Sequence, residues 1–501
     1  MTTSVPPCSR RTFLKASALA AAGAAFSARS WAQVAGANGD VRVAVVGLNG
    51  RGKNHVSSLR AIPSVRLVAL CDPDSAVLRR AAESVGGGVK TYRDIRLLLA
   101  SPDVDAITIA MPNHWHSLAA IWACQAGKDV YVEKPVSHTV WEGRQLVTAA
   151  AKYGRIVQAG TQIRSGEGLR EAVEWVRAGN LGKITASRGF CYKFRGSIGL
   201  TTGPQPVPET VDYDLWCGPA PLAPLRRKRL HYDWHWVWPT GDGDVGNQGI
   251  HQMDVARWFL GEPGLPRHTL SVGGRLGYAD DGETPNTQVV IHDYPTAPLI
   301  FEVRGLPSKP VAETAGDSGS AEAAGARASL MDNYHGVSVG NVVDCEGGSV
   351  VTASYFSATA RDREGKVVKE FRGKDRHMAN FIDVVRSRKE ADLYGPVGEG
   401  HVSSALCHLG SISHRAGRAA DPGQTLEQVR GNPPLAEAYG RLVEHLAANG
   451  VDLAKTPATL GLPLRVDARN EALVGSPEAA LLLTREYREP YRVPDFASRT
   501  A

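Results

Sequence analysis

The stretch VRVAVV, residues 41–46, runs directly into GLNGRG, residues 47–52, and a helix-compatible stretch follows. A short apolar run that ends in glycine is typical of a buried parallel strand. A dinucleotide-binding turn uses glycine for the tight turn, for the close approach of the pyrophosphate and for the packing of helix on strand. Gly47 and Gly52 hold the first and third of these places, and Asn49, a residue type that tolerates left-handed backbone, holds the second. The turn by itself is a weak indication of dinucleotide binding, because the chain has 53 glycines.

Asp72 follows the second predicted strand, residues 65–70, and lies twenty residues after Gly52. A carboxylate at this place can hydrogen-bond the adenine-ribose hydroxyls and would repel a 2′-phosphate, which favours NAD over NADP. Arg79 and Arg80 lie further along the chain and could bind a 2′-phosphate, so NADP remains an alternative. The alternative for Asp72 is a helix cap or a turn residue.

Strand-like and helix-like stretches continue to alternate as far as about residue 160. Further predicted strands cover 103–111 and 129–132, and predicted helices cover 77–85 and 117–126. This alternation predicts a doubly wound parallel sheet, an N-terminal Rossmann domain over residues 40–160.

The pattern changes after residue 162, because helical stretches become fewer and Gly/Pro turns separate the β-compatible runs. These runs are 184–190, 287–291 and 299–303, and helical pattern returns at 377–388 and 398–415. We predict an α+β domain with a mainly antiparallel sheet over residues 161–420. The Ala-, Gly- and Ser-rich residues 307–328 predict a flexible surface insertion, and residues 421–501 form a C-terminal extension to which the sequence assigns no role.

The first 32 residues predict a twin-arginine signal peptide. SRRTFLK, residues 9–15, precedes an Ala-rich apolar stretch over residues 16–26, and Ser30-Trp31-Ala32 offers a cleavage site. The predicted partner is the twin-arginine export machinery, and the predicted location is the periplasm. The apolar stretch is shorter than the ~20 residues that span a bilayer. No later segment reaches that length, so we expect no membrane insertion after cleavage.

The charge balance of the chain argues against nucleic acid as a partner. The 501 residues include 57 basic and 51 acidic side chains, a formal charge of +6. Four of the basic side chains lie in residues 1–32, which leaves 53 basic and 51 acidic ones in the mature chain. An excess of two charges does not predict binding to nucleic acid.

The seven cysteines are scattered without a C-x-x-C pair, so we predict neither a metal cluster nor a dense disulfide framework. One or two disulfide bridges remain an alternative, since they could form outside the cytoplasm.

Glu133-Lys134-Pro135 ends the predicted strand 129–132, at the sheet edge where ligands of this architecture bind. A lysine beside a positively charged nicotinamide ring has a reason for a lowered pKa and can act as an acid or hydrogen-bond donor. Glu133 could pair with it. The alternative is an ordinary surface lysine at a strand end.

Residues 43–136, with MPNHWH at 111–116 and EKP at 133–135, resemble the Gfo/Idh/MocA oxidoreductase family. GIHQMD at 249–254 resembles that family's second catalytic segment, and the resemblance covers about residues 40 to 415. It implies an N-terminal domain that binds NAD(P) and a C-terminal domain with an open sheet that contacts the substrate. It also implies that a homo-oligomer forms, since family members often pair through the open sheet face.

The resemblance implies that Lys134 and His251 orient and deprotonate a hydroxyl of a sugar or cyclitol. Many members place an aspartate four residues before that histidine, where this chain has Asn247. Asparagine can orient a hydroxyl or an imidazole but adds no negative charge. Asp244 and Asp254 are near in sequence and could compensate.

The remaining histidines are not predicted to bind metal. His231 and His235 have the spacing of a helical metal pair, but tryptophans 234, 236 and 238 alternate at strand period, which disfavours a metal site. Such tryptophans more often pack in a core or an interface, and the alternative is a sugar-stacking surface, which we assign to Trp236. His114 and His116 follow a strand end at the expected cofactor cleft, where a positioning role suits them better than metal binding. For His401, His408 and His414 on a predicted helix we expect structural burial.

The predicted function is therefore an exported NAD-dependent oxidoreductase that acts on a secondary hydroxyl of a sugar or glycoside with a tightly held, recycled cofactor. The first alternative is an NAD-dependent glycosidase that works by transient oxidation, elimination, water addition and re-reduction, and the second is a non-catalytic sugar-binding protein. The predicted catalytic and substrate residues are Lys134, Asn247 and His251, with Trp236 as a further substrate contact, and no metal site is predicted. The predicted cofactor contacts are Gly47, Asn49, Gly50, Arg51, Gly52, Asp72, Pro112, Asn113, His116, Glu133 and Lys134.

Overall fold

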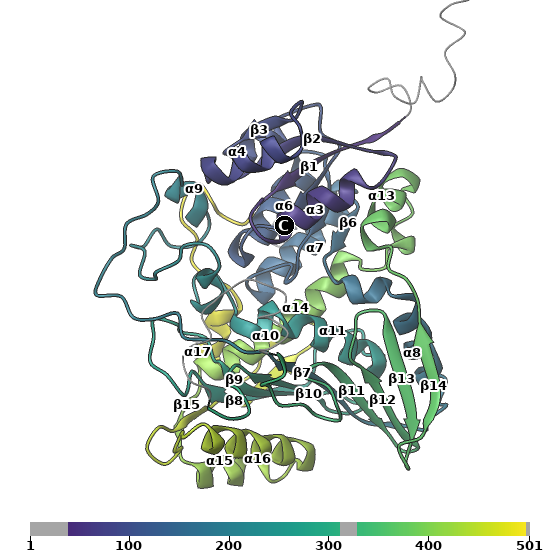
Figure 1. The fold of residues 1–501 in the computed structure, drawn as a ribbon, viewed down its shortest axis with the longest axis vertical. Coiled ribbons are helices and arrows are strands. Elements are labelled where there is room, and N and C mark those ends of the chain that lie inside the picture. Colours follow the sequence, from purple (N-terminus) through teal and green to yellow (C-terminus); the bar gives the residue numbers. More distant parts are fainter. Residues whose placement is uncertain (1–38, 311–327, 497–501) are drawn as a thin grey trace, which may run out of the picture.

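The computed structural model describes residues 39–310 and 328–496, which form two sheets with helices around and between them (Figure 1). The signal segment 1–32 and most of the predicted insertion 307–328 lie outside the described residues.

The first sheet has six parallel strands in the order β3-β2-β1-β4-β5-β6. Its strands are Val41–Val46 (β1), Val65–Cys71 (β2), Lys90–Tyr92 (β3), Ala106–Ile109 (β4), Asp129–Val132 (β5) and Val157–Ala159 (β6). Its helices are Arg51–Arg60 (α3), Ser75–Ser84 (α4), Ile95–Leu99 (α5), His116–Gln125 (α6) and Val140–Tyr153 (α7). The predicted Rossmann fold is confirmed, and β3, β6, α5 and α7 are elements to which the sequence analysis gave no bounds.

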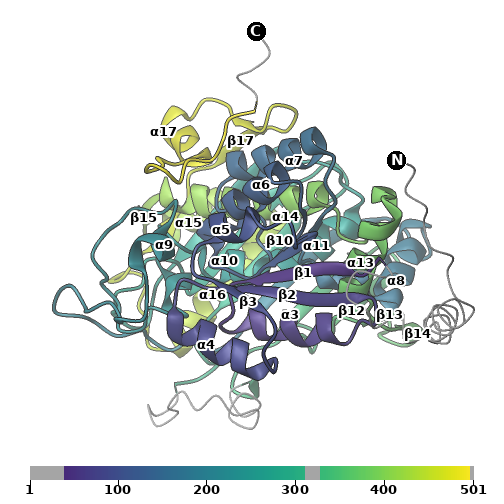
Figure 2. The same ribbon diagram turned by 90° about the horizontal axis from the view of Figure 1, so that it is seen from above.

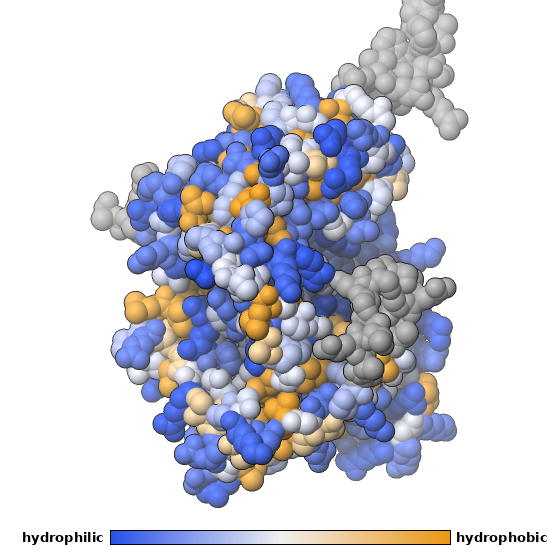
Figure 3. Space-filling view, turned by 60° about the vertical axis from the view of Figure 1, so that its left-hand side comes forward, coloured by the Kyte–Doolittle hydropathy of each residue, from blue (hydrophilic) through white to orange (hydrophobic). Residues whose placement is uncertain are grey.

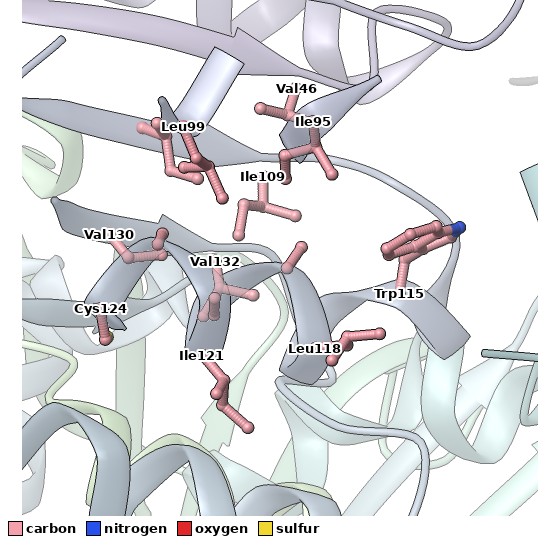
Figure 4. Packing of buried hydrophobic residues seen from close by; sticks show 14 of the residues in the cluster. Val46, Ile95, Leu99, Ile109, Trp115, Leu118, Ile121, Cys124, Val130 and Val132 are labelled. Carbon is pink, nitrogen blue, oxygen red and sulfur yellow. The ribbon is translucent and has the colours of Figure 1, made fainter. Parts of the chain in front are cut away.

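The parallel strands are buried on both faces, which explains their continuous apolar runs. Figure 4 shows one side of this core, where Ile109 of β4 and Val132 of β5 lie close to Leu118 and Ile121 of α6. All four side chains are inaccessible to solvent, and each such burial contributes about 1.5–3 kcal/mol to the free energy of folding.

The second sheet has twelve strands, and all of its pairs are antiparallel except β7 with β10. The strands on its main path are Ile184–Tyr192 (β7), His268–Gly274 (β8), Thr287–Asp293 (β9), Leu299–Arg304 (β10), Val339–Cys345 (β11), Gly348–Thr352 (β12), Ser357–Asp362 (β13), Val367–Arg372 (β14), Arg418–Ala420 (β15) and Ala458–Leu460 (β16). Leu464–Asp467 (β17) pairs with β8, and Ala472–Leu473 (β18) pairs with β17. The predicted α+β fold with a mainly antiparallel sheet is confirmed.

Several helices belong to this second part of the chain. They are Glu167–Arg177 (α8), Tyr213–Cys217 (α9), Gly243–Asn247 (α10), Gly249–Leu260 (α11), His377–Ser387 (α13), Val397–Arg415 (α14), Pro422–Val429 (α15), Pro433–Ala448 (α16) and Pro477–Ala480 (α17). The 3-10 turns are Asn113–Trp115 (η1), Gln162–Ser165 (η2), Asp233–Trp236 (η3), Glu390–Asp392 (η4) and Leu481–Leu483 (η5).

Later segments of the chain complete the first domain. Phe381, Ile382 and Val384 of α13 are buried in one cluster with Val43 and Val45 of β1. The helix α14 packs against α7 of the first domain and against α11 and β8 of the second. The two domains therefore share a continuous helical layer, although they follow each other along the sequence.

The C-terminal extension forms part of the fold. Ile300 of β10 points to the face covered by α15 and α16, whereas Leu299 and Phe301 point to the face covered by α11, as the alternation of a strand requires. Figure 1 shows α15 and α16 on the side of the sheet away from the first domain. Further along, Tyr491 packs its ring against Trp115 of the first domain at a centroid distance of 5.6 Å. Figure 2 shows this last part of the chain, in yellow, beside α6 and α7.

The visible surface is mostly hydrophilic, with apolar residues scattered in small groups (Figure 3). Across the two described ranges no helix is both long and apolar enough to cross a membrane.

We predict that Leu442→Ala in α16 destabilises the protein by about 2–5 kcal/mol, since this side chain is buried against the second sheet. Leu426→Ala in α15 serves as the control, because Leu426 is 51% exposed and should change the free energy of unfolding by less than about 0.5 kcal/mol. Denaturant unfolding of both variants measures the difference. Equal effects would contradict the assignment of the extension to the folded core.

Candidate functional site

A cavity of about 680 Å³ opens at the carboxyl ends of the parallel strands. Gly47 follows β1, Asp72 follows β2, Met111 follows β4 and Glu133 follows β5, and all four line the cavity. The opposite wall comes from the second domain and includes His251 of α11. The site therefore lies where open α/β sheets bind their ligands.

The turn after β1 depends on two glycines for different reasons. Gly47 has φ +81°, and a Cβ there would lie 2.6 Å from the main-chain oxygen of Ala110. At Gly52 a Cβ would lie 1.9 Å from the main-chain oxygen of Gly47, so this glycine sets the packing of α3 on the turn. Gly50 has φ +59° with nothing within 4 Å of an added Cβ. Gly52 does not line the cavity, whereas Gly47, Asn49 and Gly50 do.

The first turn of α3 has no side-chain cap and no acidic residue. Its free N–H groups and the helix dipole therefore favour a negatively charged group in the adjacent cavity. Arg51, the first residue of α3, also lines the cavity.

Asp72 is held by the backbone. Its Oδ2 accepts a hydrogen bond from the Leu48 N–H at 2.9 Å, and its Oδ1 accepts one from the Asp74 N–H at 2.9 Å. Burial raises the pKa of Asp72. Each oxygen of a carboxylate has a second lone pair, so Asp72 can still accept hydrogen bonds from hydroxyl groups in the cavity. Arg79 and Arg80 are exposed on α4 and do not line the cavity.

Glu133 is buried and accepts three hydrogen bonds on one oxygen. Arg51 Nε lies 2.9 Å from its Oε1, and His55 Nε2 and Gln162 Nε2 each lie 3.0 Å away. Although burial opposes ionisation, the hydrogen bond and charge of His55 and the charge of Arg51 hold the pKa of Glu133 well below its usual range. The Lys134 side chain is not among these partners, so the ion pair within the EKP segment that we considered from the sequence does not form.

Lys134 instead reaches across to the second domain. Its Nζ donates a hydrogen bond to the main-chain oxygen of Asn247 at 2.5 Å. Burial lowers the pKa of Lys134, and the nearby charge of Arg51 acts in the same direction. The amine is thus fixed at the boundary of the two domains.

His251 lies in the first turn of α11, with 5% of its surface exposed, and lines the same cavity as Lys134. Its Nδ1 is buried without a hydrogen-bond partner. Burial, and then the charge of Lys134, lower the pKa of His251 to about 3. The imidazole is therefore neutral at physiological pH, and its ring lies 5.3 Å from that of Tyr355.

The side chain of Asn247 contacts one of the two acids that we considered as substitutes. Asn247 Nδ2 lies 3.4 Å from Asp244 Oδ1, and Asp244 is paired with Arg195 at 2.7 Å. Asp254 is buried in a separate pair with Arg164 at 2.8 Å. Asp244 is thus the acid next to Asn247.

The aromatic prediction was wrong in one position. Trp236 is 5% exposed and does not line the cavity, whereas Trp234 does. The reason is that residues 233–236 form the 3-10 turn η3, which replaces the strand period that the tryptophan spacing indicated. His235 also lines the cavity, and its ring stacks on that of Trp234.

The MPNHWH segment, residues 111–116, lines part of the cavity and joins the loops around it by hydrogen bonds. The His116 ring nitrogens lie 2.6 Å from the Pro135 oxygen and 2.7 Å from the Met111 oxygen, which ties the loops after β4 and β5 together. Asn113 Nδ2 donates to Asp242 Oδ2 at 3.2 Å. Pro112, Asn113 and His116 line the cavity, and His114 does not.

Other cavity residues were not identified from the sequence. Among them are Lys193, Trp216, Tyr232, Gln248, Tyr355 and Phe356. Most lie in irregular segments between strands, where neither periodicity nor a short motif distinguishes them.

Two further histidines are bonded to acids. His231 lines the cavity and bonds Asp74 at 3.0 Å, whereas His401 does not line it and bonds Glu471 at 2.9 Å. Within residues 39–310 and 328–496 no group of three or more His, Cys, Asp and Glu side chains could hold a metal ion. The six cysteines in that part of the chain are free, so the bridges that the sequence left open do not form among them.

Family models match both domains. The model of an oxidoreductase family with an NAD-binding Rossmann fold, Gfo/Idh/MocA, matches residues 41–161. The model of that family's C-terminal α/β domain matches residues 171–273. A model of the twin-arginine signal sequence matches residues 7–27.

Curated relatives match only part of the chain. A levoglucosan dehydrogenase of Pseudarthrobacter phenanthrenivorans is 26% identical over 46% of this chain and 55% of its own length. A glycosyl hydrolase family 109 protein of Shewanella baltica is 31% identical over 29% of this chain and 33% of its own length. The chain thus spans about half or less of these relatives.

Among solved structures, the WlbA dehydrogenase from Bordetella pertussis, in complex with NADH and UDP-GlcNAcA, superposes with a TM-score of 0.54. It is 20% identical and covers 75% of this chain and 97% of its own. At this identity the likeness is one of fold.

We predict that His251 does not titrate between pH 5 and pH 8, because its pKa lies near 3. The ring signals of His251 in a histidine NMR titration, assigned by their loss in His251→Gln, measure this. A midpoint near the ordinary histidine value of about 6.5 would contradict the burial described here.

Proposed function

Since the chain belongs to the Gfo/Idh/MocA oxidoreductase family, we propose that it is an exported, NAD-dependent enzyme that acts on a secondary hydroxyl of a sugar or glycoside. The observation that carries the proposal is one cavity that holds Lys134 and His251 from two domains beside the glycine turn after β1.

The residues present fit a dinucleotide. The positive φ of Gly47 and Gly50 and the uncapped first turn of α3 provide an open cradle for a pyrophosphate. Asp72 would accept hydrogen bonds from the ribose hydroxyls. Neither Arg79 nor Arg80 lines the cavity, which supports NAD over NADP. When bound, the nicotinamide supplies hydride acceptance and donation.

Lys134 is the better candidate for proton transfer. Burial lowers the lysine pKa towards neutrality, where a general base or acid works best. The pKa of His251 moves away from neutrality to about 3, so its neutral ring suits hydrogen bonding to a substrate hydroxyl. In this assignment His251 orients the hydroxyl and Lys134 takes up its proton. Asn247 positions Lys134 through its main-chain oxygen.

The names of the relatives support a carbohydrate substrate. They include a levoglucosan dehydrogenase, and the WlbA structure holds a nucleotide sugar. Trp234 and Trp216 in the cavity wall offer aromatic faces against which a sugar ring can pack.

The family 109 glycosyl hydrolases among the relatives favour a second candidate, a glycosidase. There the same proton-transfer groups serve a temporary oxidation that acidifies a neighbouring C–H, and the hydride returns to the sugar after the aglycone has left and water has added. Both candidates use the same cavity and differ in the product.

The twin-arginine signal supports delivery of the folded protein to the periplasm. A twin-arginine route permits loading of the cofactor before export, and the two-domain cavity favours tight retention. We therefore propose that the cofactor is regenerated in place, either by the same sugar or by a second substrate. Formation of a homo-oligomer stays a prediction.

We expect extensively dialysed mature protein to retain NAD or NADH and to turn over a glycoside many times with no nucleotide added. Mass spectrometry of the denatured protein identifies the nucleotide, and analysis of the products identifies the reaction. A keto sugar or lactone means net oxidation, and a free aglycone means hydrolysis. Nucleotide-free protein that requires added NAD for every turnover would refute the recycling, and mostly NADP would refute the role of Asp72.

We predict that Lys134→Ala and His251→Ala each keep the bound nucleotide but lower kcat by about 10²–10⁴-fold, the usual contribution of acid–base groups. The rate of the native enzyme should rise with pH as Lys134 loses its proton, below the ordinary lysine pKa of about 10.4, and Lys134→Ala should lack this rise. His268→Ala is the control, since that histidine is exposed on β8. Near-native turnover of both site variants would show that the assigned site is wrong.

A further inference from the structure

A second cavity of about 320 Å³ shares no lining residue with the first. It is lined by His138, which precedes α7, and by His408 in the middle of α14. Trp238, Pro239 and Asp242 of the segment before α10 and residues 481–486 of the C-terminal extension complete the wall. None of the functional assignments above involves it.

Buried polar atoms in this cavity have no partner. Both ring nitrogens of His138 and the Nδ1 of His408 are buried without a hydrogen bond, and His408 is only 3% exposed. His408 Nδ1 lies 3.6 Å from Asp242 Oδ1, which is too long for a hydrogen bond. Leaving such groups unpaired costs about 1–3 kcal/mol each, and native proteins rarely leave several together. The cluster is therefore suited to hydrogen bonds with a ligand.

The protonation states point to a neutral ligand. Burial lowers the pKa of His138 to about 4, so its ring is uncharged and offers one donor and one acceptor. Although burial opposes ionisation, the neighbouring imidazoles and Asn113 hold the pKa of Asp242 at about 2. The buried carboxylate accepts hydrogen bonds from hydroxyl groups and repels an anion.

The rest of the wall fits a polyhydroxylated ring. The Ser411 hydroxyl adds a further donor and acceptor, and Trp238 offers an indole beside the apolar side chains of Ile412 and Leu482. Two arginines also line the cavity. Arg415 is exposed and its guanidinium lies over the Trp238 ring at 5.2 Å, and Arg485 is paired with the buried Glu142 at 2.7 Å. The volume is at the lower end of small-molecule sites, as expected for one sugar ring.

We propose that this second cavity is a binding site for a neutral polyol or monosaccharide. Asp242 links it to the first cavity, because its other carboxylate oxygen accepts the hydrogen bond from Asn113. The proposal does not depend on the redox activity, since it requires binding alone.

The test is calorimetric titration of the dialysed full-length mature protein with glycerol, myo-inositol, glucose and galactose, and in parallel with sodium sulfate and phosphate. Ser411→Phe fills the cavity, and His138→Leu removes both ring nitrogens at similar volume. We expect at least one neutral probe to bind, and each variant to weaken it about tenfold or more. His138→Gln, which keeps a donor and an acceptor, should restore part of the affinity, and thermal unfolding checks that each variant folds.

His251→Ala separates the two cavities, because it alters only the first. Binding that survives His251→Ala and is lost in Ser411→Phe supports the second site whatever the turnover measurements give. The proposal is overturned if no neutral probe binds, if folded Ser411→Phe and His138→Leu both bind as the native protein does, or if sulfate or phosphate binds there more tightly than every neutral probe.

Discussion

The buried carboxylate of Glu133 ties together the elements that build the first cavity. Its Oε1 accepts hydrogen bonds from Arg51 and His55 of α3 and from Gln162 at the entry to the second domain. Removal of one partner from a buried charge of this kind typically costs about 3–5 kcal/mol. The position of α3, of the loop after β5 and of the entry to the second domain therefore depends on one ionised group.

In this arrangement the Lys134 side chain contacts the second domain and not Glu133. Glu133 Oε1 is turned towards α3, and the neighbouring amine contacts the main chain of Asn247 instead. The replacement of a family aspartate by Asn247 then has a limited effect on the amine, since the contact uses a backbone oxygen that every residue provides. Negative charge near the amine comes from Glu133 and, beside Asn247, from Asp244, which Arg195 holds in place.

Local patterns predicted the first domain because its strands are short apolar runs followed by recognisable turns. The strands β3 and β6 and the helix α5 were not assigned, since three and five residues are too few to establish a period. The 14-residue helix α7 was not assigned either. The aromatic contact was placed on Trp236 because alternating tryptophans imitate a strand, and only the winding of η3 brings Trp234 to the cavity. The sequence assigned no role to the extension after residue 421, because its contacts with β8–β10 and with Trp115 join residues far apart in sequence.

The site was predictable to the extent that a motif marks it. Lys134 and His251 lie in recognisable segments, whereas Tyr355 and Lys193 reach the cavity from segments without a pattern. The hydrogen bond from Lys134 to the main-chain oxygen of Asn247 could not be predicted, because every residue type has such an oxygen. The second cavity could not be predicted either, because its walls come from the segment before α7, from α14 and from the extension, which lie far apart in sequence.

The central claim is that one substrate hydroxyl meets Lys134 and His251 together. A crystal structure of the mature protein with its nucleotide and an unreactive glycoside analogue tests it most directly. We expect one sugar oxygen within hydrogen-bond distance of both Lys134 Nζ and a ring nitrogen of His251. A sugar that lies elsewhere, with Lys134 still bound only to the Asn247 backbone, would contradict it.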